Sequence, residues 1–115
     1  MTQAEIKSFI EAWIESANQF DAKKYLSFFM DDAVLDDPSV GSAFEGHNGI
    51  RDYFESYFIG YNTHTRLVKL NILSKHAVHV EVHFTGTFPG GAIGGTFDIT
   101  FQGNRISFIK ADLIH

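Results

Sequence analysis

The sequence changes its hydrophobic period near Gly60, and this change limits the fold more than any other feature. Before Gly60, apolar residues recur every three to four positions, which is typical of amphipathic helices. After it, apolar and polar residues alternate, which is typical of strands with one buried face. Helices followed by strands that short turns connect indicate an α+β domain. We therefore expect helices packed on a curved, mostly antiparallel sheet, with a cone-shaped cavity between the two layers.

The first half of the chain carries the signals that begin and end helices. Thr2 and Glu5 have the spacing of a capping box, and Asp21 is a typical N-cap for a second helix. Gly60 is a suitable C-terminal cap for a third. The expected helices cover residues 3–18, 22–29 and 47–59.

The second half reads as a meander of strands. Turn signals separate the alternating segments, and the dipeptide at residues 103–104, Gly-Asn, is a two-residue hairpin signal. The sequence has no repeat, linker or low-complexity segment, so we expect one domain over residues 1–115. The expected strands cover residues 63–73, 77–88, 93–102 and 105–114.

A short strand is also expected at residues 33–37, before Pro38, which cannot donate to a sheet ladder. Side chains alternate along a strand, so only one of Asp36 and Asp37 can face the core. A carboxylate that faces inwards is costly unless it is paired, protonated or used in chemistry. Asp37 is therefore a candidate catalytic residue, and the alternative is a carboxylate that caps a turn at the strand's end.

Composition excludes several classes of function. The nine Lys and Arg residues are scattered and the net charge is −5, so we expect no nucleic-acid partner. The chain has no cysteine and therefore no thiol chemistry. No apolar run approaches ~18 residues, and charged residues among the first 20 exclude a signal peptide, so we expect no membrane partner and a cytoplasmic protein.

The metal and phosphate signals are weak. His79, Glu81 and His83 share one strand face, but such neighbours are ~7 Å apart along a flat strand, so we expect no metal site. The glycine-rich segment at residues 89–95 has strand flanks and no following Lys-Ser or Lys-Thr, so it does not match a phosphate-binding loop. We expect no cofactor.

The segments MDDAVLDDP and AFEGHNGIRDYF, in this order of helices and strands, resemble the NTF2-like superfamily, in particular SnoaL-like polyketide cyclases and ketosteroid isomerases. The resemblance covers nearly the whole chain. It implies a cystatin-like roll of three helices on the sheet. The related enzymes commonly need no cofactor. The superfamily also contains non-catalytic binding modules, so the fold does not decide the function.

The resemblance also assigns roles to particular residues. Asp37 falls on the proton-abstracting carboxylate of the isomerases, and Asp98 falls on their protonated oxyanion-hole aspartate. Trp13 occupies the position of their oxyanion tyrosine, which argues against steroid isomerase activity. Alternation alone places Asp98 on a polar face opposite the apolar face of its strand, so the resemblance and the periodicity disagree.

An apolar wall is expected around these acids. We assign ligand-binding roles to Trp13, Phe28, Phe54 and Tyr57, with core packing as the alternative for Trp13 and Tyr57. Tyr53 and Tyr61 could also line a pocket, since tyrosine has an apolar body and a polar tip. The 12 Phe could instead fill the cavity.

Three functions remain open. The first is a small enzyme that performs acid–base chemistry on a hydrophobic carbonyl compound, with Asp37 as base and Asp98 as acid or oxyanion partner. The second is a non-catalytic module that binds a small hydrophobic ligand, and the third is an interaction domain with a filled cavity. If Asp98 faces the cavity, the apolar face of its strand needs another cover, so we expect a homodimer through the sheet face.

Overall fold

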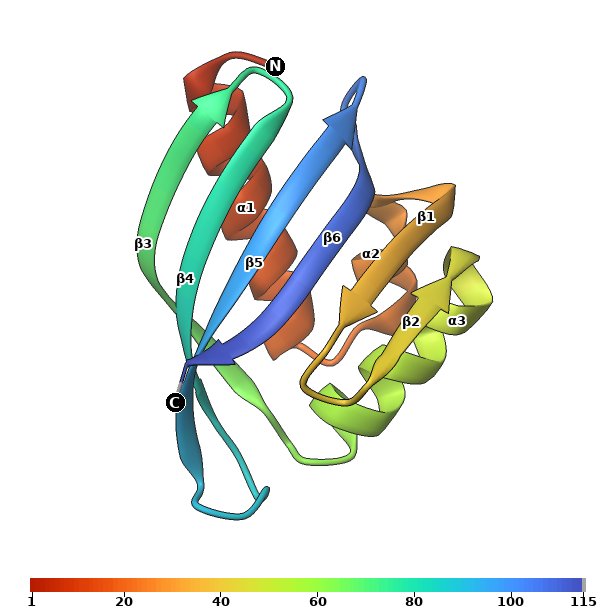
Figure 1. Cartoon of the computed structure of the whole chain (residues 1–115), viewed down its shortest axis with the longest axis vertical. Helices are drawn as coiled ribbons and strands as arrows, with labels where there is room; N and C mark the ends of the chain where they lie inside the picture. The colour runs from red at the N-terminus through yellow and green to blue at the C-terminus, as the bar shows by residue number, and fades with distance from the viewer. Residues whose placement is uncertain (115) are drawn as a thin grey trace.

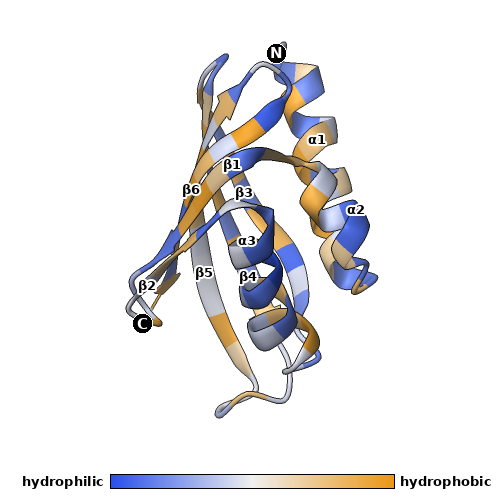
Figure 2. Ribbon diagram, turned by 90° about the vertical axis from the view of Figure 1, so that its right-hand side faces the viewer, coloured by the Kyte–Doolittle hydropathy of each residue, from blue (hydrophilic) through white to orange (hydrophobic). Residues whose placement is uncertain are grey.

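The computed structural model describes residues 1–114, and in it three helices lie on one side of a curved six-stranded sheet (Figures 1 and 2). This confirms the expected α+β roll. The helices are α1 (Gln3–Asn18), α2 (Ala22–Ser27) and α3 (Gly46–Phe54), and the π-helical segment η1 (Glu55–Ile59) continues α3. The strands are β1 (Phe29–Asp37), β2 (Ser42–Glu45), β3 (His64–Ser74), β4 (Ala77–Thr85), β5 (Ala92–Gln102) and β6 (Arg105–Ile114).

The strand order in the sheet is β2-β1-β6-β5-β4-β3. All neighbouring pairs are antiparallel except β1 and β6, which run parallel, so the sheet is mixed. This pairing explains one error in the expected boundaries. β1 begins at Phe29 rather than at residue 33, because Phe29 already pairs with Ile106, and α2 accordingly ends at Ser27. β2 is a strand that the sequence analysis did not expect, and it pairs with the end of β1 in a hairpin.

The amphipathic face of α1 packs on the inner face of the sheet. Its capping box forms as expected: the Thr2 hydroxyl accepts from the Glu5 N–H, and the Glu5 carboxylate accepts from the Thr2 N–H. The ring of Phe9 lies edge-on to Phe101, with 5.1 Å between centroids, and Trp13 lies in the same way against Phe97. The chain's own helix therefore covers the apolar face of β5.

This packing removes the reason for which a homodimer was expected. The apolar face of β5 needs no second subunit, and the opposite face carries Glu81, Asp98 and Lys110. The large apolar side chains of the sheet that are exposed are Val68, Leu73, Phe108 and Ile114. The homodimer stays a prediction.

Aromatic rings fill the narrow end of the roll. Tyr25 and Phe54 are fully buried and stack with 4.1 Å between their ring centroids, and Phe29 packs beside them. The wide end, where β1 ends and α3 continues into η1, stays open. Among the described residues, no helix is long and apolar enough to cross a membrane.

Candidate functional site

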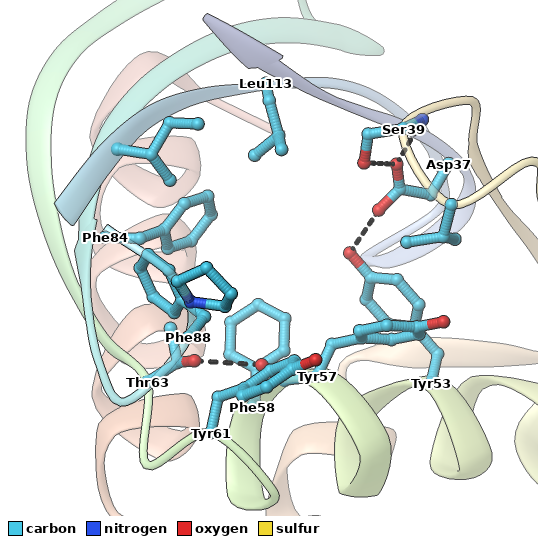
Figure 3. Close-up of a pocket in the computed structure, with 13 residues that line it drawn as sticks. Asp37, Ser39, Tyr53, Tyr57, Phe58, Tyr61, Thr63, Phe84, Phe88 and Leu113 are labelled. Atoms are coloured by element: carbon cyan, nitrogen blue, oxygen red, sulfur yellow. Dashed lines mark hydrogen bonds between the residues drawn. The ribbon is translucent and has the colours of Figure 1, made fainter. Parts of the chain in front are cut away.

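A pocket of about 250 Å³ lies at the wide end of the roll (Figure 3). Its walls come from segments that are distant in the sequence: the turn after β1, the α3–η1 helix, the loop before β3, the β4–β5 hairpin and the end of β6. The lining residues are Asp37, Ser39, Val40, Tyr53, Tyr57, Phe58, Tyr61, Thr63, Phe84, Phe88, Pro89, Ile93 and Leu113.

Asp37 is the acid of this pocket, and it is 5% exposed. It is the last residue of β1, and Pro38 starts a turn in which Ser39 folds back over the carboxylate. Oδ1 accepts from the Ser39 backbone N–H at 2.9 Å and from the Ser39 hydroxyl, and Oδ2 accepts from the Tyr53 hydroxyl at 2.8 Å. A carboxylate offers about four acceptor positions. Three are filled, so one position on Oδ2 has no donor from the described chain.

Tyr53 lies between this carboxylate and the core. Burial, followed by the negative charge of Asp37, raises the pKa of Tyr53 well above its ordinary value. The phenol therefore keeps its proton and acts as a donor to Asp37 across the physiological pH range. Tyr53 does not act as a base, and it holds the Asp37 carboxylate in one orientation at the pocket wall.

Asp98 lies on the other face of the sheet, so the expected meeting of Asp37 and Asp98 in one cavity is wrong. Its neighbours Phe97 and Ile99 are buried, and strand alternation turns Asp98 away from the helices. Its side chain is 56% exposed and is hydrogen-bonded to Nδ1 of His79 on β4. The periodicity of the strand predicted this orientation, and the resemblance to the isomerases did not.

The expected wall residues separate into two groups. Tyr57 lines the pocket, as do Tyr53 and Tyr61, which occur at intervals of four residues along α3, η1 and the following turn. Trp13 and Phe54 are buried in the core, 2% and 0% exposed, and do not line the pocket. Both were expected to bind ligand. For Trp13 the structure agrees with the alternative, core packing in an amphipathic helix.

Phe28 also lies away from the pocket. It is the C-cap residue of α2 and packs edge-on against Phe9, with 5.1 Å between ring centroids. Trp13 borders a second cavity, of about 10 Å³, in which its indole Nε1 has no hydrogen-bond partner within the described chain.

Ser39, Phe88 and Leu113 belong to the site but were not expected there. The Asp-Pro-Ser sequence after a strand is a turn signal that could have indicated Ser39, because a serine two residues after an aspartate can donate to it. Phe88 and Leu113 carry no such local signal. They reach the pocket only because the β4–β5 hairpin and the end of β6 lie over it.

The described residues contain no group of three side chains placed to hold a metal ion. His79, Glu81 and His83 lie on the outer face of β4 at alternating positions, and His79 is directed to Asp98. The groups that the pocket can offer a ligand are the Asp37 carboxylate, aromatic rings and tyrosine side chains.

Solved structures of the same fold were found at low sequence identity. A protein of unknown function with a cystatin-like fold from Methylobium petroleophilum is 18% identical, with a TM-score of 0.88, and the match covers 100% of this chain and 79% of that one. A candidate polyketide cyclase from Sinorhizobium meliloti is 17% identical, with a TM-score of 0.81, and covers 90% and 93%. At these identities the likeness extends to the fold.

A third match is a hypothetical protein from Catenulispora acidiphila with a ketosteroid isomerase-like fold, solved in complex with trimethylamine. It is 16% identical, with a TM-score of 0.79, and the match covers 90% of this chain and 82% of that one. No curated protein matches the sequence significantly.

The family comparison gives a more specific result. The model of the SnoaL-like domain matches residues 10–112, which include the whole sheet except its last residues and every residue of the pocket except Leu113. The chain therefore belongs to the SnoaL-like domain family.

Proposed function

We propose that this protein binds a small, mostly apolar organic molecule in the Asp37 pocket, and that Asp37 accepts a hydrogen bond or a proton from it. One observation carries the proposal: a carboxylate that is 5% exposed lines an apolar pocket of about 250 Å³, and one acceptor position on its Oδ2 has no donor from the described chain. Concave apolar sites with a few directed polar groups are the usual form of small-molecule sites.

A catalytic version of this proposal has Asp37 as general base. Asp37 would take a proton from the carbon next to a carbonyl group. The electron pair of that C–H bond would form the C=C bond of an enolate, and the π pair of the carbonyl group would move to its oxygen. The resulting oxyanion needs a donor. Asp98 cannot supply it from the other face of the sheet, whereas Tyr57 lines the pocket and carries a hydroxyl that could donate. This would be cofactor-independent isomerase or cyclase chemistry on a small hydrophobic carbonyl compound.

The fold neighbours are compatible with both versions. One is named as a candidate polyketide cyclase, and another is described as a protein of unknown function. The trimethylamine complex of the Catenulispora acidiphila protein adds small amines to the compounds worth testing. The binding version requires fewer groups. It needs the pocket and Asp37, and the catalytic version also needs an oxyanion donor at the correct distance.

Binding can be tested by NMR titration of the isotope-labelled protein with small cyclic ketones, aromatic alcohols and alkylamines. We expect a bound compound to shift the amide signals of residues near the pocket, such as Ser39, Thr63 and Ile93. Ile93→Trp, which fills the pocket from β5, should abolish these shifts. Shifts that persist in this variant, or that cluster on the outer face of the sheet, would contradict the proposal.

Proton abstraction can be tested without knowing the substrate. The protein is mixed in D₂O with 2-tetralone, an apolar ketone with acidic α-hydrogens, and deuterium incorporation is followed by NMR. If Asp37 acts as a base, exchange should exceed the buffer rate by about tenfold or more. Asp37→Asn should remove the excess and Asp98→Asn should keep it. Exchange at the buffer rate in the wild type leaves the binding version alone.

A further inference from the structure

The charges around the pocket are unbalanced. Of its lining residues, Asp37 is the one acid, and the lining contains no Lys, Arg or His. The donors that hold Asp37, Ser39 and Tyr53, are neutral. The ion pairs of the described chain involve His47 with Asp31 and His79 with Asp98, both outside the pocket.

An unpaired carboxylate in this position favours a ligand with a positive charge. Neutral donors stabilise the anion, but they leave its net charge uncompensated, and the interaction of two charges is stronger in an apolar site than in water. An anionic ligand would meet repulsion from Asp37. Two hydroxyls of the lining are also already engaged, because the Ser39 hydroxyl is directed to Asp37 and the Thr63 hydroxyl donates to the Tyr57 carbonyl at 2.8 Å.

Much of the remaining lining is aromatic, and this is the second observation. Figure 3 shows rings on the side of the pocket opposite Leu113 and beneath Asp37. They are close enough to form a continuous surface: ring centroids are 5.4 Å apart between Tyr53 and Tyr57, 6.4 Å between Tyr57 and Tyr61, and 6.1 Å between Tyr61 and Phe88. The negative faces of such rings attract ammonium groups, particularly alkylated ones.

We infer that the ligand of this pocket carries a protonated alkylamine, with its N–H directed to the open position on Oδ2 of Asp37 and its alkyl groups against the aromatic rings. This inference rests on the proposed function, since it names the class of molecule that the same pocket binds. It follows from the balance of charge and the lining: one buried carboxylate, no cationic lining residue, and aromatic rings on the adjoining wall.

Two pairs of probes isolate the charge from the shape. N,N-Dimethylethanolamine and 3-methylbutan-1-ol have the same shape, but only the amine is charged at neutral pH. Choline and 3,3-dimethylbutan-1-ol form a second such pair, and choline has no N–H. We expect each cation to bind about tenfold or more tightly than its neutral isostere in NMR titrations, and the amine to bind more tightly than choline.

Three variants assign the preference to particular groups. Asp37→Asn should remove most of the preference and leave each cation at most about threefold to fivefold tighter than its isostere, which is the share of the aromatic rings. Tyr61→Leu, at a residue that is 37% exposed, should weaken the cations by about threefold to fivefold and leave the isosteres unchanged. Tyr53→Phe keeps the carboxylate and removes one donor, so it should retain the preference for cations even if Asp37→Asn does not fold.

The outcomes separate this inference from the proposed function. If the neutral alcohols bind in the pocket as tightly as the cations, or if the cations do not bind while neutral compounds do, the inference is wrong and the pocket still binds ligands. If Asp37→Asn folds and keeps the full preference for cations, the charge that recognises them is not Asp37. If neither cations nor neutral compounds bind, both proposals fail.

Discussion

The two faces of the sheet give an aspartate side chain opposite environments. Asp37 ends β1 on the inner face, where it is 5% exposed and three neutral donors hold its carboxylate at a pocket. Asp98 is in β5 on the outer face, where its side chain is 56% exposed and contacts His79. Their residue type is identical, so the difference lies in which face the strand register gives each one. Asp37 is a candidate for function because it is buried and also lines a pocket.

The largest contrast between the faces should appear in stability, when one phenylalanine on each face is replaced by alanine. Phe54 is fully buried and stacks on Tyr25, so Phe54→Ala should lower the free energy of unfolding by about 3–5 kcal/mol, as measured by urea denaturation. Phe108 is 40% exposed on the outer face, and Phe108→Ala should cost less than about 1 kcal/mol. A large loss at Phe108 would indicate that the outer face is covered, for example by a second copy of the chain.

The hydrogen bond from Tyr53 to Asp37 should give the next largest effect. Tyr53→Phe removes a donor to a buried carboxylate, which should lower the free energy of unfolding by about 1.5–3 kcal/mol. Tyr61→Phe makes the same chemical change in the same pocket, at a hydroxyl for which no side-chain hydrogen bond is found in the described chain. It should change stability by less than about 0.5 kcal/mol. Equal effects would mean that the bond to Asp37 contributes little.

The buried tyrosines of the inner face should also make stability depend on pH in the alkaline range. Burial raises the pKa of Tyr25, and burial together with Asp37 raises the pKa of Tyr53, above the ordinary value of 10.0. Above that pH the unfolded chain loses protons that the folded chain keeps, so stability should fall as pH rises. The slope should be about 1.4 kcal/mol per pH unit for each tyrosine.

Denaturation series between pH 9 and 11 can measure this slope in the wild type and in Tyr53→Phe. The slope of the variant should be smaller by the contribution of one tyrosine, which is about 1.4 kcal/mol per pH unit. Tyr61→Phe is the control and should keep the slope of the wild type. A Tyr53→Phe slope equal to that of the wild type would show that Tyr53 ionises at its ordinary pH in the folded chain.

The smallest effect is expected on the outer face. Asp98→Asn removes the charge of an exposed pair with His79, and such pairs contribute about 0–1 kcal/mol. We expect unchanged ligand binding and a stability within about 1 kcal/mol of the wild type. If Asp98→Asn weakens binding in the pocket as strongly as Asp37→Asn, the comparison between the two faces does not explain function.

Local patterns predicted the order of elements because each helix and strand buries one face with its own period. The alternation around Phe97 and Ile99 also predicted that Asp98 points outwards, and the resemblance to isomerases reversed a correct expectation. β2 was missed because its four residues are mostly exposed and have no apolar period. Its pairing with β1 is decided by the turn after Asp37.

The site was predictable only in part. Asp37 was singled out because an inward carboxylate before a proline needs an explanation, and Tyr57 because tyrosine has an apolar body and a polar tip. The sequence could not separate pocket from core along one helical stripe: Phe54 is in the core, while Tyr53 and Tyr57 line the pocket. That distinction depends on where the aromatic filling of the roll ends, which is a property of the packed layers.

The most direct test follows the two carboxyl groups themselves. The side-chain ¹³Cγ signals of Asp37 and Asp98, assigned through the Asp→Asn variants, are recorded while a compound that binds the protein is added. The account predicts that the Asp37 signal moves in proportion to the fraction bound and that the Asp98 signal does not. A moving Asp98 signal beside a stationary Asp37 signal would contradict it.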